Sequence, residues 1–410
     1  MVDQFFSDPV LSERLHRGPI GPRIDAFARH LSERGYARWT AKEKIRVVAR
    51  FGRWLESEGR AAEDVDEQVV SAFLRYRRRR DLSLHGALPA LRDLLTYLRD
   101  ARIIPRAHIE RGPFHAIEGC FIRYLTEQRG LAKPTIDHYL PTVRALLSER
   151  FGGGPIALDE LTPKDIPGFI LRHAKRVGSR HVQIITTALR SLFRFLYGRG
   201  MISMDLAASV PSVANWRLSG LPKFLEPEQV ERLLETCNRA TCSGRRDYAI
   251  LLLLARLGLR AGEVVHMEFD DLDWENGELM VRGKSRRQDR LPIPRDVGQA
   301  LAGYLHKGRP RCSSRRVFLR LRAPVQGFTS SVAICDIVRR ALVRAGLDPG
   351  RKGSHLLRHS LATRMLRVGA SLAEIGEILR HELPSTTEIY TKVDVAALRA
   401  LALPWQGGAL

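Results

Sequence analysis

The sequence predicts a mainly α-helical chain with a small β-sheet: two helical modules in tandem, followed by an α+β domain. Three observations support this prediction. Apolar residues recur at helical spacing through most of the 410 residues, two stretches of the first half resemble each other, and one pair of β-like runs flanks a turn in the second half. We therefore expect the modules at residues 1–110 and 111–211 and the α+β domain at residues 222–410.

The two modules look like copies of one unit. Each begins with an amphipathic helix, which contains FARHL at residues 27–31 in one module and FIRYL at residues 121–125 in the other. Each ends in a similar way, with LLTYLRDARII at residues 94–104 and LFRFLYGRGMI at residues 192–202. The offset is 94 residues at the start and 98 at the end, which indicates a tandem repeat. Two unrelated helical bundles that are alike by chance are the alternative.

A linker and then a third segment follow the modules. The stretch 209–222 lacks periodicity and is bracketed by prolines, so we expect it to be a linker. LEPEQV at residues 225–230 predicts a helix start with a proline in the first turn, and a long apolar helix then ends near Gly258. The runs 279–281 and 290–293 flank a turn and predict a β-hairpin, and the pattern is helical again from Ser330.

The charge of the chain points to a polyanionic partner. The formal net charge is +22, and ten of the 67 basic residues are lysine, which leaves 57 arginines. Arginine offers a rigid fork of donors that matches a phosphate group. An excess of this size therefore favours nucleic acid as the partner.

Other classes of protein fit the sequence poorly. The five cysteines are odd in number and show no Cys-x-x-Cys spacing, so we expect neither a disulfide framework nor a metal site. We expect the protein to occupy a reducing compartment. Residues 1–23 lack the apolar stretch of a signal peptide. The most apolar run, residues 248–254, is too short to span a bilayer, so no membrane partner is expected.

The third segment contains the residue types that phosphodiester cleavage without a metal needs. That chemistry requires a nucleophile, cations for the phosphate oxygens and an acid for the leaving oxygen. The candidates, in chain order, are Arg260, Lys284, His355, Arg358, His381 and Tyr390. Each alone has an ordinary structural interpretation, such as an exposed arginine at a helix end or a packed aromatic ring. The complete set in this order is the observation that indicates catalysis.

Four motifs in this segment resemble the tyrosine recombinase (phage integrase) family. They are LGLRAGEV at 257–264, VRGKSRRQDRLPIP at 281–294, HLLRHSLATRML at 355–366 and ILRHELPSTTEIYTKV at 378–393. The lysine of the second motif lies 24 residues after Arg260, and His381 precedes Tyr390 by nine residues. Two positions depart from the family pattern: Arg380 stands where glycine is usual, and Lys392 where histidine is common. Arg380 bears on the turn at that point, because glycine adopts a positive φ at little cost.

The resemblance implies a fold and a reaction. The fold is a pair of helical SAM-like DNA-binding modules followed by a tyrosine recombinase catalytic domain. Tyr390 would attack the scissile phosphate and form a 3′-phosphotyrosyl ester, and a 5′ hydroxyl from another strand would reverse the step. Neither a metal nor another cofactor is then required.

The resemblance also implies a role for each remaining candidate. Arg260 and Arg358 would bind the non-bridging oxygens, with His381 as a further donor. Lys284 would protonate the departing 5′ oxygen, and His355 would assist proton transfer at the tyrosine. Glu263 would orient Arg260 or His355 without touching the substrate.

Basic side chains outside this set are candidates for DNA contact. In the first module these are Arg75, Arg77 and Arg78 of the run RYRRRR, and in the hairpin turn Arg286 and Arg287. In the second module they are Lys164, Arg172, Lys175, Arg176, Arg180 and His181. All could contact a phosphate backbone, or merely form a solvated helix face or turn.

The expected function is site-specific recombination for integration, excision or transposition of a mobile element. The expected partners are double-stranded DNA, further copies of the chain in a tetramer on two paired sites, and companion recombinases, all in the bacterial cytoplasm at the nucleoid. The apolar tail at residues 394–403 is a helix candidate, which family members commonly dock on a neighbouring protomer, and packing on its own chain is the alternative.

Two other functions stay open. A type IB-like topoisomerase or telomere resolvase would share the chemistry, although the short hairpin and the short tail after Tyr390 argue against it. A non-catalytic architectural DNA-binding protein would share the fold, but such a protein does not need the complete catalytic set.

Overall fold

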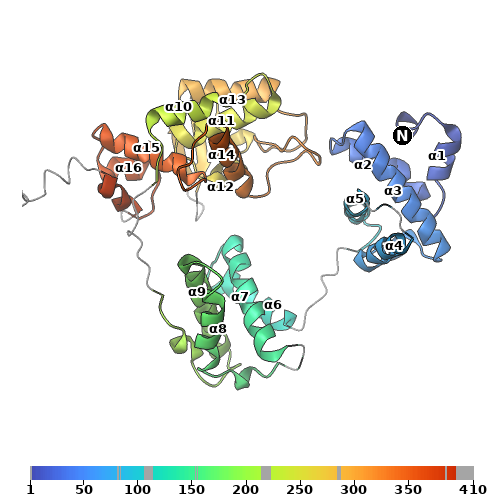
Figure 1. The fold of residues 1–410 in the computed structure, drawn as a ribbon, viewed down its shortest axis with the longest axis horizontal. Helices are drawn as coiled ribbons and strands as arrows, with labels where there is room; N and C mark the ends of the chain where they lie inside the picture. Colours follow the sequence, from blue (N-terminus) through green and yellow to red (C-terminus); the bar gives the residue numbers. More distant parts are fainter. Residues whose placement is uncertain are drawn as a thin grey trace, which may run out of the picture. The chain divides into compact units, whose positions relative to one another are not determined.

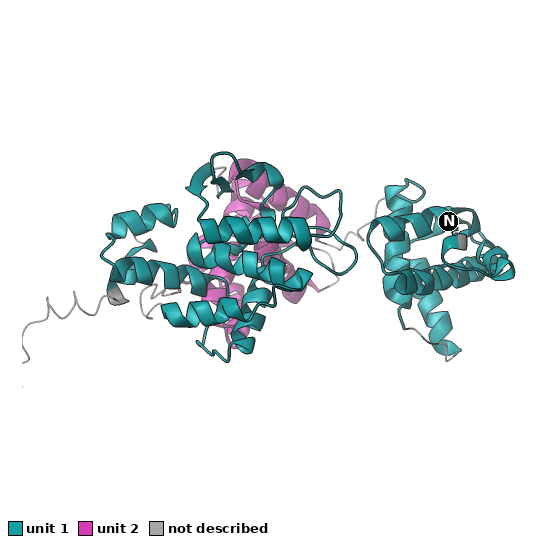
Figure 2. Ribbon diagram, turned by 90° about the horizontal axis from the view of Figure 1, so that it is seen from above, with its two compact units in different colours: residues 1–105, 220–410 teal, residues 106–219 magenta. Residues whose placement is uncertain are grey.

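A computed structural model describes residues 2–80, 83, 85–105, 114–152, 154, 156–213, 223–283, 288–383 and 386–393 of the chain. The chain divides into two compact units, residues 1–105 with 220–410 and residues 106–219 (Figure 2). Three large hydrophobic clusters form the cores: one in the first helical module, one in the second and one in the third segment. The predicted tail at 394–403 and most of the predicted linker lie outside the described residues.

The first module is helical throughout its described residues (Figure 1). Its helices are α1 (Pro9–Leu15), α2 (Ile24–Glu33), α3 (Arg38–Ser57), α4 (Glu67–Arg79) and α5 (Ala87–Asp100). Short 3₁₀ turns lie at Val2–Gln4, Gly21–Arg23 and Ala62–Asp64. Helix α3 is amphipathic and packs against both α2 and α5, so that the apolar faces of the helices close one core.

The second module repeats the order of the last four helices of the first, α2 to α5. It contains α6 (His115–Arg123), a π-helical turn (Tyr124–Gln128), α7 (Lys133–Phe151), α8 (Asp165–Ala174) and α9 (Ser179–Gly198), with 3₁₀ turns at Leu158–Glu160 and Leu206–Ser209. Equivalent positions are buried in both copies: Phe27 and Phe121 are fully enclosed, as are Leu94 and Leu192. The sequence offsets of 94 and 98 residues therefore correspond to equivalent places in two cores.

In the third segment one buried helix is packed against five others, and a sixth helix packs on one of those five. Helix α11 (Cys242–Arg256) contacts α10 (Pro227–Glu235), α12 (Ala261–His266), α13 (Arg295–Lys307), α14 (Val332–Arg344) and α15 (His355–Arg367), and α15 contacts α16 (Leu372–Ile378). The α11 run from Ala249 to Ala255 is buried on all sides, which explains its continuous apolar sequence. As predicted, α10 begins with Pro227 in its first turn.

A three-stranded antiparallel sheet completes this segment. It consists of β1 (Leu272–Asp273), β2 (Glu278–Arg282) and β3 (Gln288–Pro292), in the order β1-β2-β3. The pairing of Arg282 with Gln288 closes the predicted hairpin. The fold class is therefore confirmed: helices dominate the described residues, and the sheet is small.

The last described element is a 3₁₀ helix, η10 (Glu388–Val393), which contacts α15. It contributes Tyr390 to a small separate cluster with Ala362, Ile375 and Leu379. No helix in the described part of the chain combines the length and apolar character needed to cross a membrane.

Candidate active site

Arg260 lies at the N-cap of α12, directly after the turn that ends α11. Gly258 in this turn has φ +58°, and a Cβ there would come 2.6 Å from Leu379 Cδ2, so the position requires glycine. Arg260 donates through its backbone N to Glu263 Oε2 (2.7 Å) and through Nη1 to Glu263 Oε1 (2.9 Å). One acidic side chain thus satisfies the start of the helix and fixes the guanidinium.

Arg358 lies on α15 and is only 4% exposed. Its two Nη atoms donate to the backbone oxygens of Gly258 and Leu379. Burial, together with the positive charges of Arg260 and Arg380, lowers the pKa of Arg358 to about 10. The guanidinium therefore remains charged at neutral pH, in a place that favours an incoming anion.

Arg380 forms the turn that ends α16. Its φ is +55°, and the backbone N–H groups of Arg380 and His381 donate to the oxygens of Glu377 (2.9 Å) and Gly376 (2.8 Å). This is the Schellman arrangement, in which the left-handed residue is usually glycine. The turn that the family builds with glycine therefore forms here with arginine.

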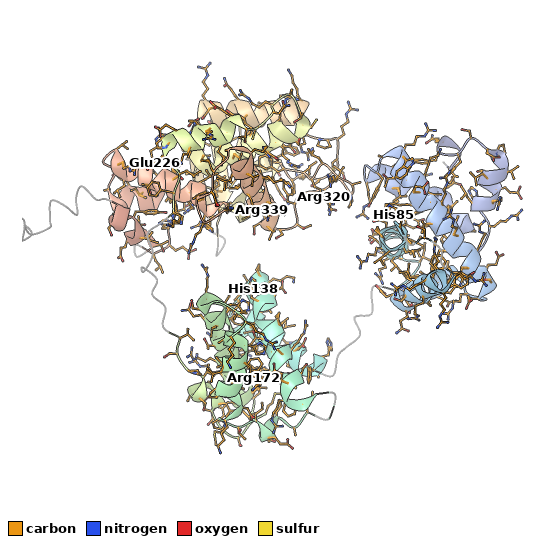
Figure 3. All side chains as sticks on the ribbon, viewed as in Figure 1. His85, His138, Arg172, Glu226, Arg320 and Arg339 are labelled. Carbon is orange, nitrogen blue, oxygen red and sulfur yellow. The ribbon has the colours of Figure 1, made fainter. Side chains whose placement is uncertain are left out.

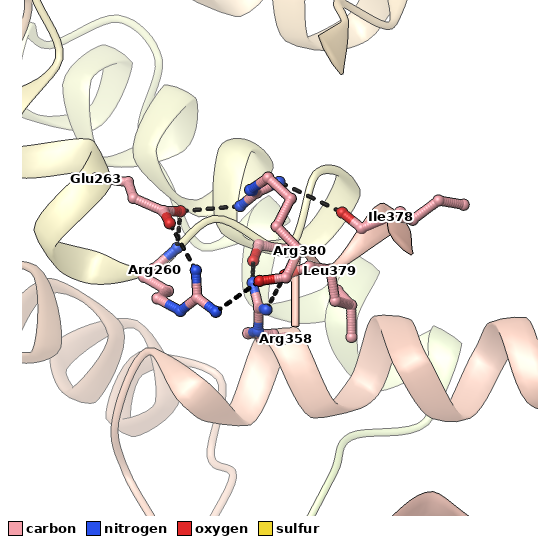
Figure 4. A network of polar contacts seen from close by, with 7 residues as sticks. Arg260, Glu263, Arg358, Ile378, Leu379 and Arg380 are labelled. Carbon is pink, nitrogen blue, oxygen red and sulfur yellow. Dashed lines mark hydrogen bonds and ion pairs between the residues drawn. The ribbon is translucent and has the colours of Figure 1, made fainter. Parts of the chain in front are cut away.

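The side chain of Arg380 points into the site, where Glu263 joins it to Arg260 (Figure 4). Arg380 Nη2 donates to Glu263 Oε2 (2.9 Å), and Arg260 Nη2 donates to the backbone oxygen of Arg380 (3.0 Å). Arg380 is 5% exposed, and its buried Nε has no hydrogen-bond partner in the structure. With Arg358 the cluster holds three guanidinium groups and one carboxylate, a surplus of positive charge.

Tyr390 is 1% exposed and lies on η10. Burial raises the pKa of its phenol to about 12, although the nearby Arg358 acts in the opposite direction. At neutral pH the hydroxyl is therefore protonated and needs a group that takes its proton before it can act as a nucleophile.

His359 holds the hydroxyl of Tyr390. Its Nδ1 lies 2.9 Å from Tyr390 Oη, and the two rings meet edge to face with centroids 5.6 Å apart. Burial lowers the pKa of His359 to about 4, with His355 and Arg358 contributing to the shift. The imidazole is therefore neutral at physiological pH.

His381 lies on the other side of Tyr390. The two rings are nearly parallel (7°) with centroids 6.5 Å apart, and His381 Nδ1 lies 2.8 Å from Thr387 Oγ1. Burial, followed by the charges of Arg358 and Arg260, lowers the pKa of His381 to about 4. When Thr387 donates to Nδ1, the ring proton lies on Nε2, which can donate to a ligand oxygen.

His355 is the first residue of α15 and is exposed. Its ring centroid lies 6.4 Å from that of His359, one helical turn further on. The structure thus brings Arg260, Glu263, Arg358, His381 and Tyr390 together, with His355 at the margin. Lys284, Arg286 and Arg287 lie outside the described residues, although both strands that flank them are described.

Two of the three first-module arginines that are predicted to contact DNA are exposed, and the third is buried. Arg75 and Arg78 are exposed on α4. Arg77 is 6% exposed and donates to the backbone oxygen of Ser83, with its guanidinium 5.8 Å from the centre of the Phe73 ring. Helical spacing places Arg77 four residues after Phe73 on the core face, so the prediction of DNA contact for Arg77 is not supported.

The predicted set in the second module is exposed. It comprises Lys164, Arg172, Lys175, Arg176, Arg180 and His181. Arg172 lies on α8 (Figure 3). It pairs with Glu149 Oε2 at 2.8 Å, so part of its charge is already balanced. The other five remain available as positive or hydrogen-bonding groups on the surface of this module.

Two residues of the site were missed at the level of sequence: His359 and Arg380. His359 is four residues after His355, so both lie on one side of α15, and the spacing alone does not show which of them faces Tyr390. Arg380 was noticed only as a departure at a turn. Its pairing with Glu263 spans 117 residues of sequence, and no local pattern indicates it.

Among the described residues, no group of three or more His, Cys, Asp or Glu side chains is arranged to hold a metal ion. The chemistry that the described side chains offer is phosphate binding by guanidinium groups beside a buried phenol and two neutral imidazoles.

Models of known protein families match the two helical modules and the third segment of the chain. The profile of the Phage integrase family matches residues 223–396, and that of the phage integrase N-terminal SAM-like domain matches twice, at residues 24–102 and 120–200. The predicted repeat is thereby confirmed as two SAM-like domains.

Several curated proteins are similar over most of their length. The Sinorhizobium fredii protein y4rA, named as an integrase/recombinase, is 45% identical over 396 residues, which is 96% of each chain. The tyrosine recombinase XerD of Mycobacterium tuberculosis is 31% identical over 305 residues, covering 70% of this chain and 95% of its own.

Solved structures show the same fold. XerH site-specific recombinase bound to palindromic difH substrate matches with a TM-score of 0.56 at 19% identity, over 70% of this chain and 85% of that one. The Tn1549 transposon integrase in complex with circular intermediate DNA matches with a TM-score of 0.51 at 18% identity, over 70% and 99%. With these likenesses and the family matches, the chain belongs to the phage integrase family of tyrosine recombinases, enzymes that cleave and rejoin DNA strands.

Proposed function

We propose that this enzyme is a site-specific recombinase of a mobile element, which cleaves double-stranded DNA through a 3′-phosphotyrosyl bond to Tyr390. The observation that carries the proposal is the gathering of Tyr390, Arg358 and Arg260 in one partly buried cluster. The similarity to proteins named as integrases, one of them from a transposon, supports a role in integration, excision or transposition.

In this proposal the two arginines bind the scissile phosphate. Arg260 and Arg358 now donate to Glu263 and to backbone oxygens, and these contacts orient the guanidinium groups before DNA arrives. A phosphate can accept from their remaining N–H groups, and such charge-assisted bonds strengthen as negative charge builds on the oxygens. His381 adds a donor through Nε2.

Protons are exchanged at both ends of the cleaved bond. Lys284, which the sequence predicts to lie in the hairpin turn, protonates the 5′ oxygen as it leaves. The resemblance assigns proton transfer at the tyrosine to His355, which lies at the exposed margin of the site. A 5′ hydroxyl from the partner strand then attacks the phosphotyrosyl ester and restores the DNA backbone, so the reaction conserves the bond energy.

The wider assembly is also part of the proposal. The solved relatives XerH and the Tn1549 integrase were captured with DNA, and the exposed basic set of the second module offers a surface for a DNA backbone. We propose a tetramer on two paired sites, joined in some reactions by companion recombinases, and acting on the bacterial nucleoid in the cytoplasm.

A nicked suicide duplex that carries the end of the candidate element tests the proposal. Wild-type enzyme should form a protein–DNA adduct that survives denaturation and EDTA, and Tyr390→Phe should form none. Tyr248→Phe, a change on α11, is the matched control and should behave as wild type. An adduct that persists in Tyr390→Phe would show that the nucleophile is another residue. DNA binding without any adduct would favour an architectural protein, and relaxation of plasmids without a specific site would favour a topoisomerase.

A further inference from the structure

We propose that His359 is a catalytic residue that accepts the proton of Tyr390 during strand cleavage. The inference rests on the proposed role of Tyr390 as the nucleophile. It differs from the assignment that the resemblance implies, in which His355 assists at the tyrosine.

The geometry distinguishes His359 from the other imidazoles nearby. His359 Nδ1 lies 2.9 Å from Tyr390 Oη, which is hydrogen-bonding distance. His381 stacks on the face of Tyr390 and directs Nδ1 to Thr387 Oγ1, while His355 is exposed at the start of α15. Of the histidines in the described part of the chain, His359 is thus the one whose ring nitrogen is hydrogen-bonded to the oxygen that would attack phosphorus.

The surroundings of the pair keep His359 ready to accept a proton. Arg358 and His355 lie near it on α15, Arg351 lies in the preceding loop, and Tyr390 and His381 face it from the C-terminal segment. Burial and then the cationic neighbours lower the pKa of His359, so the ring rests in its neutral form. An incoming phosphate would bring negative charge beside the same group, and would make the imidazolium easier to form at the moment when it is needed.

The proposed step is balanced in atoms and electrons. The oxygen of Tyr390 forms a bond to phosphorus, its O–H bond breaks, and the proton moves to His359 Nδ1. The bond between phosphorus and the 5′ oxygen breaks, and that oxygen receives a proton from the general acid of the site. On resealing, the 5′ oxygen forms its bond to phosphorus and gives its proton back to the general acid of the site. The phosphotyrosyl bond breaks, and His359 returns its proton to the tyrosine oxygen.

The test compares full-length variants at position 359 on the nicked suicide duplex. His359→Asn retains a side-chain oxygen that can accept a hydrogen bond, but that oxygen does not take up a proton. We expect His359→Asn and His359→Gln to bind the duplex like wild type and to form the adduct about 100-fold more slowly or worse, as for loss of a general base. The control His306→Gln, an exposed histidine on α13, should be unaffected.

A more acidic nucleophile separates proton transfer from packing. Replacing Tyr390 by 2,3,5-trifluorotyrosine should restore much of the rate of His359→Asn and change the wild-type rate little, because the fluorinated phenol needs less help to ionise. A rate in His359→Asn equal to that of wild type, or a loss that the fluorinated residue does not repair, would overturn the inference.

The same series tells this inference apart from the proposed function. If Tyr390→Phe forms no adduct while His359→Asn reacts normally, Tyr390 remains the nucleophile and only the role of His359 is wrong. If Tyr390→Phe still forms the adduct, the nucleophile has been misassigned, and the role of His359 is wrong with it.

Discussion

Arg380 combines a strained backbone with a buried charge. A residue with a Cβ at φ +55° costs about 1–2 kcal/mol relative to the right-handed region. The guanidinium is almost fully buried, yet it donates to Glu263, which is also the partner of Arg260. The contact to Glu263 is the feature of the structure that offsets this strain, and it places a third guanidinium beside the proposed phosphate site.

This arrangement predicts an unusual order of stability for two substitutions. Both Arg380→Gly and Arg380→Ala lose the contact to Glu263, but only glycine adopts the positive φ without strain. Arg380→Gly should therefore be more stable than Arg380→Ala by about 1 kcal/mol in urea denaturation. Equal stabilities, or alanine as the more stable variant, would show that the turn does not hold a left-handed residue.

The lowered pKa values of two active-site histidines should make the free energy of unfolding depend on pH. The pKa values of His359 and His381 are lowered from 6.5 to about 4 in the folded enzyme, whereas they return to the ordinary value on unfolding. Between pH 6.5 and 4 the unfolded chain therefore binds more protons, and the free energy of unfolding should fall as the pH decreases through this window. Urea denaturation at pH 7.5, 5.5 and 4.5 measures the slope.

The control for this prediction is the double variant His359→Gln/His381→Gln. It should flatten the slope without abolishing it, because His30 in the first module also has a lowered pKa. An unchanged slope in the double variant would mean that the two active-site histidines are not responsible.

Residue identity was easier to predict from sequence than residue pairing. The motifs that resemble the tyrosine recombinase family selected Arg260, His381 and Tyr390, and the fold brings these side chains together. The hydrogen bond between His359 and Tyr390 depends on how a 3₁₀ helix meets α15, and the Glu263 contacts join segments more than one hundred residues apart. Such pairs depend on tertiary packing, and the helical periodicity of a sequence does not show which elements pack together.

At the scale of the elements, the end of α11 is the part on which the site depends. The turn at Gly258 brings the helix end against Leu379 and supplies the backbone oxygen that accepts from Arg358. Two active-site arginines therefore take their position from one close approach between α11, α15 and the end of α16.

Replacing Gly258 by alanine should damage both stability and cleavage. Its Cβ would meet Leu379 at 2.6 Å in addition to the positive φ, so we expect a loss of about 1–3 kcal/mol and a large drop in adduct formation. Gly277→Ala is the matched control, because Gly277 has φ +66° but nothing within 4 Å of the added methyl group. Urea denaturation of both variants isolates the contribution of the close approach, and equal losses would contradict it.

The elements themselves were largely predictable. The hairpin, the proline-started helix and the repeated helical pattern follow from local rules of periodicity and turn chemistry. The two-residue strand β1 and the π-helical turn after α6 were not predicted. Strand β1 is defined by its pairing with β2, and two residues are too few to show a strand pattern. The burial of Arg77 also follows from helical spacing, because Arg77 lies four residues after the buried Phe73. Its place in a run of arginines suggested an exposed side chain instead.

At the scale of the whole molecule, the duplicated SAM-like domain and the net charge of +22 both bear on how strongly DNA affinity should depend on salt. Each phosphate contact releases counterions from the DNA. The slope of log affinity against log salt is therefore proportional to the number of phosphate contacts that the protein makes. If both helical modules contact DNA, the affinity should depend more steeply on salt concentration than if one module does.

Arg75 and Arg78 allow this to be measured in the intact chain. If both contact phosphates, Arg75→Gln/Arg78→Gln should reduce the slope of log affinity against log salt by about 1.8, at about 0.9 per contact. Fluorescence anisotropy with a labelled duplex, titrated at several NaCl concentrations, measures the slope. The control Arg17→Gln/Lys133→Gln removes the same charge from residues that pair with Glu13 and Asp137, and should leave the slope nearly unchanged. Identical slopes for the two double variants would place the first module away from the DNA backbone.

The enclosure of Tyr390 also affects how safely such an enzyme can remain in a cell. A strongly basic protein spends most of its time on chromosomal DNA that does not carry its target. In the structure Tyr390 is 1% exposed and its hydroxyl lies at hydrogen-bonding distance from His359, so the residue presents almost no surface to these phosphates. If Tyr390 is the nucleophile, as proposed, this enclosure predicts few random nicks in the host genome, because a phosphate must first gain access to the enclosed oxygen.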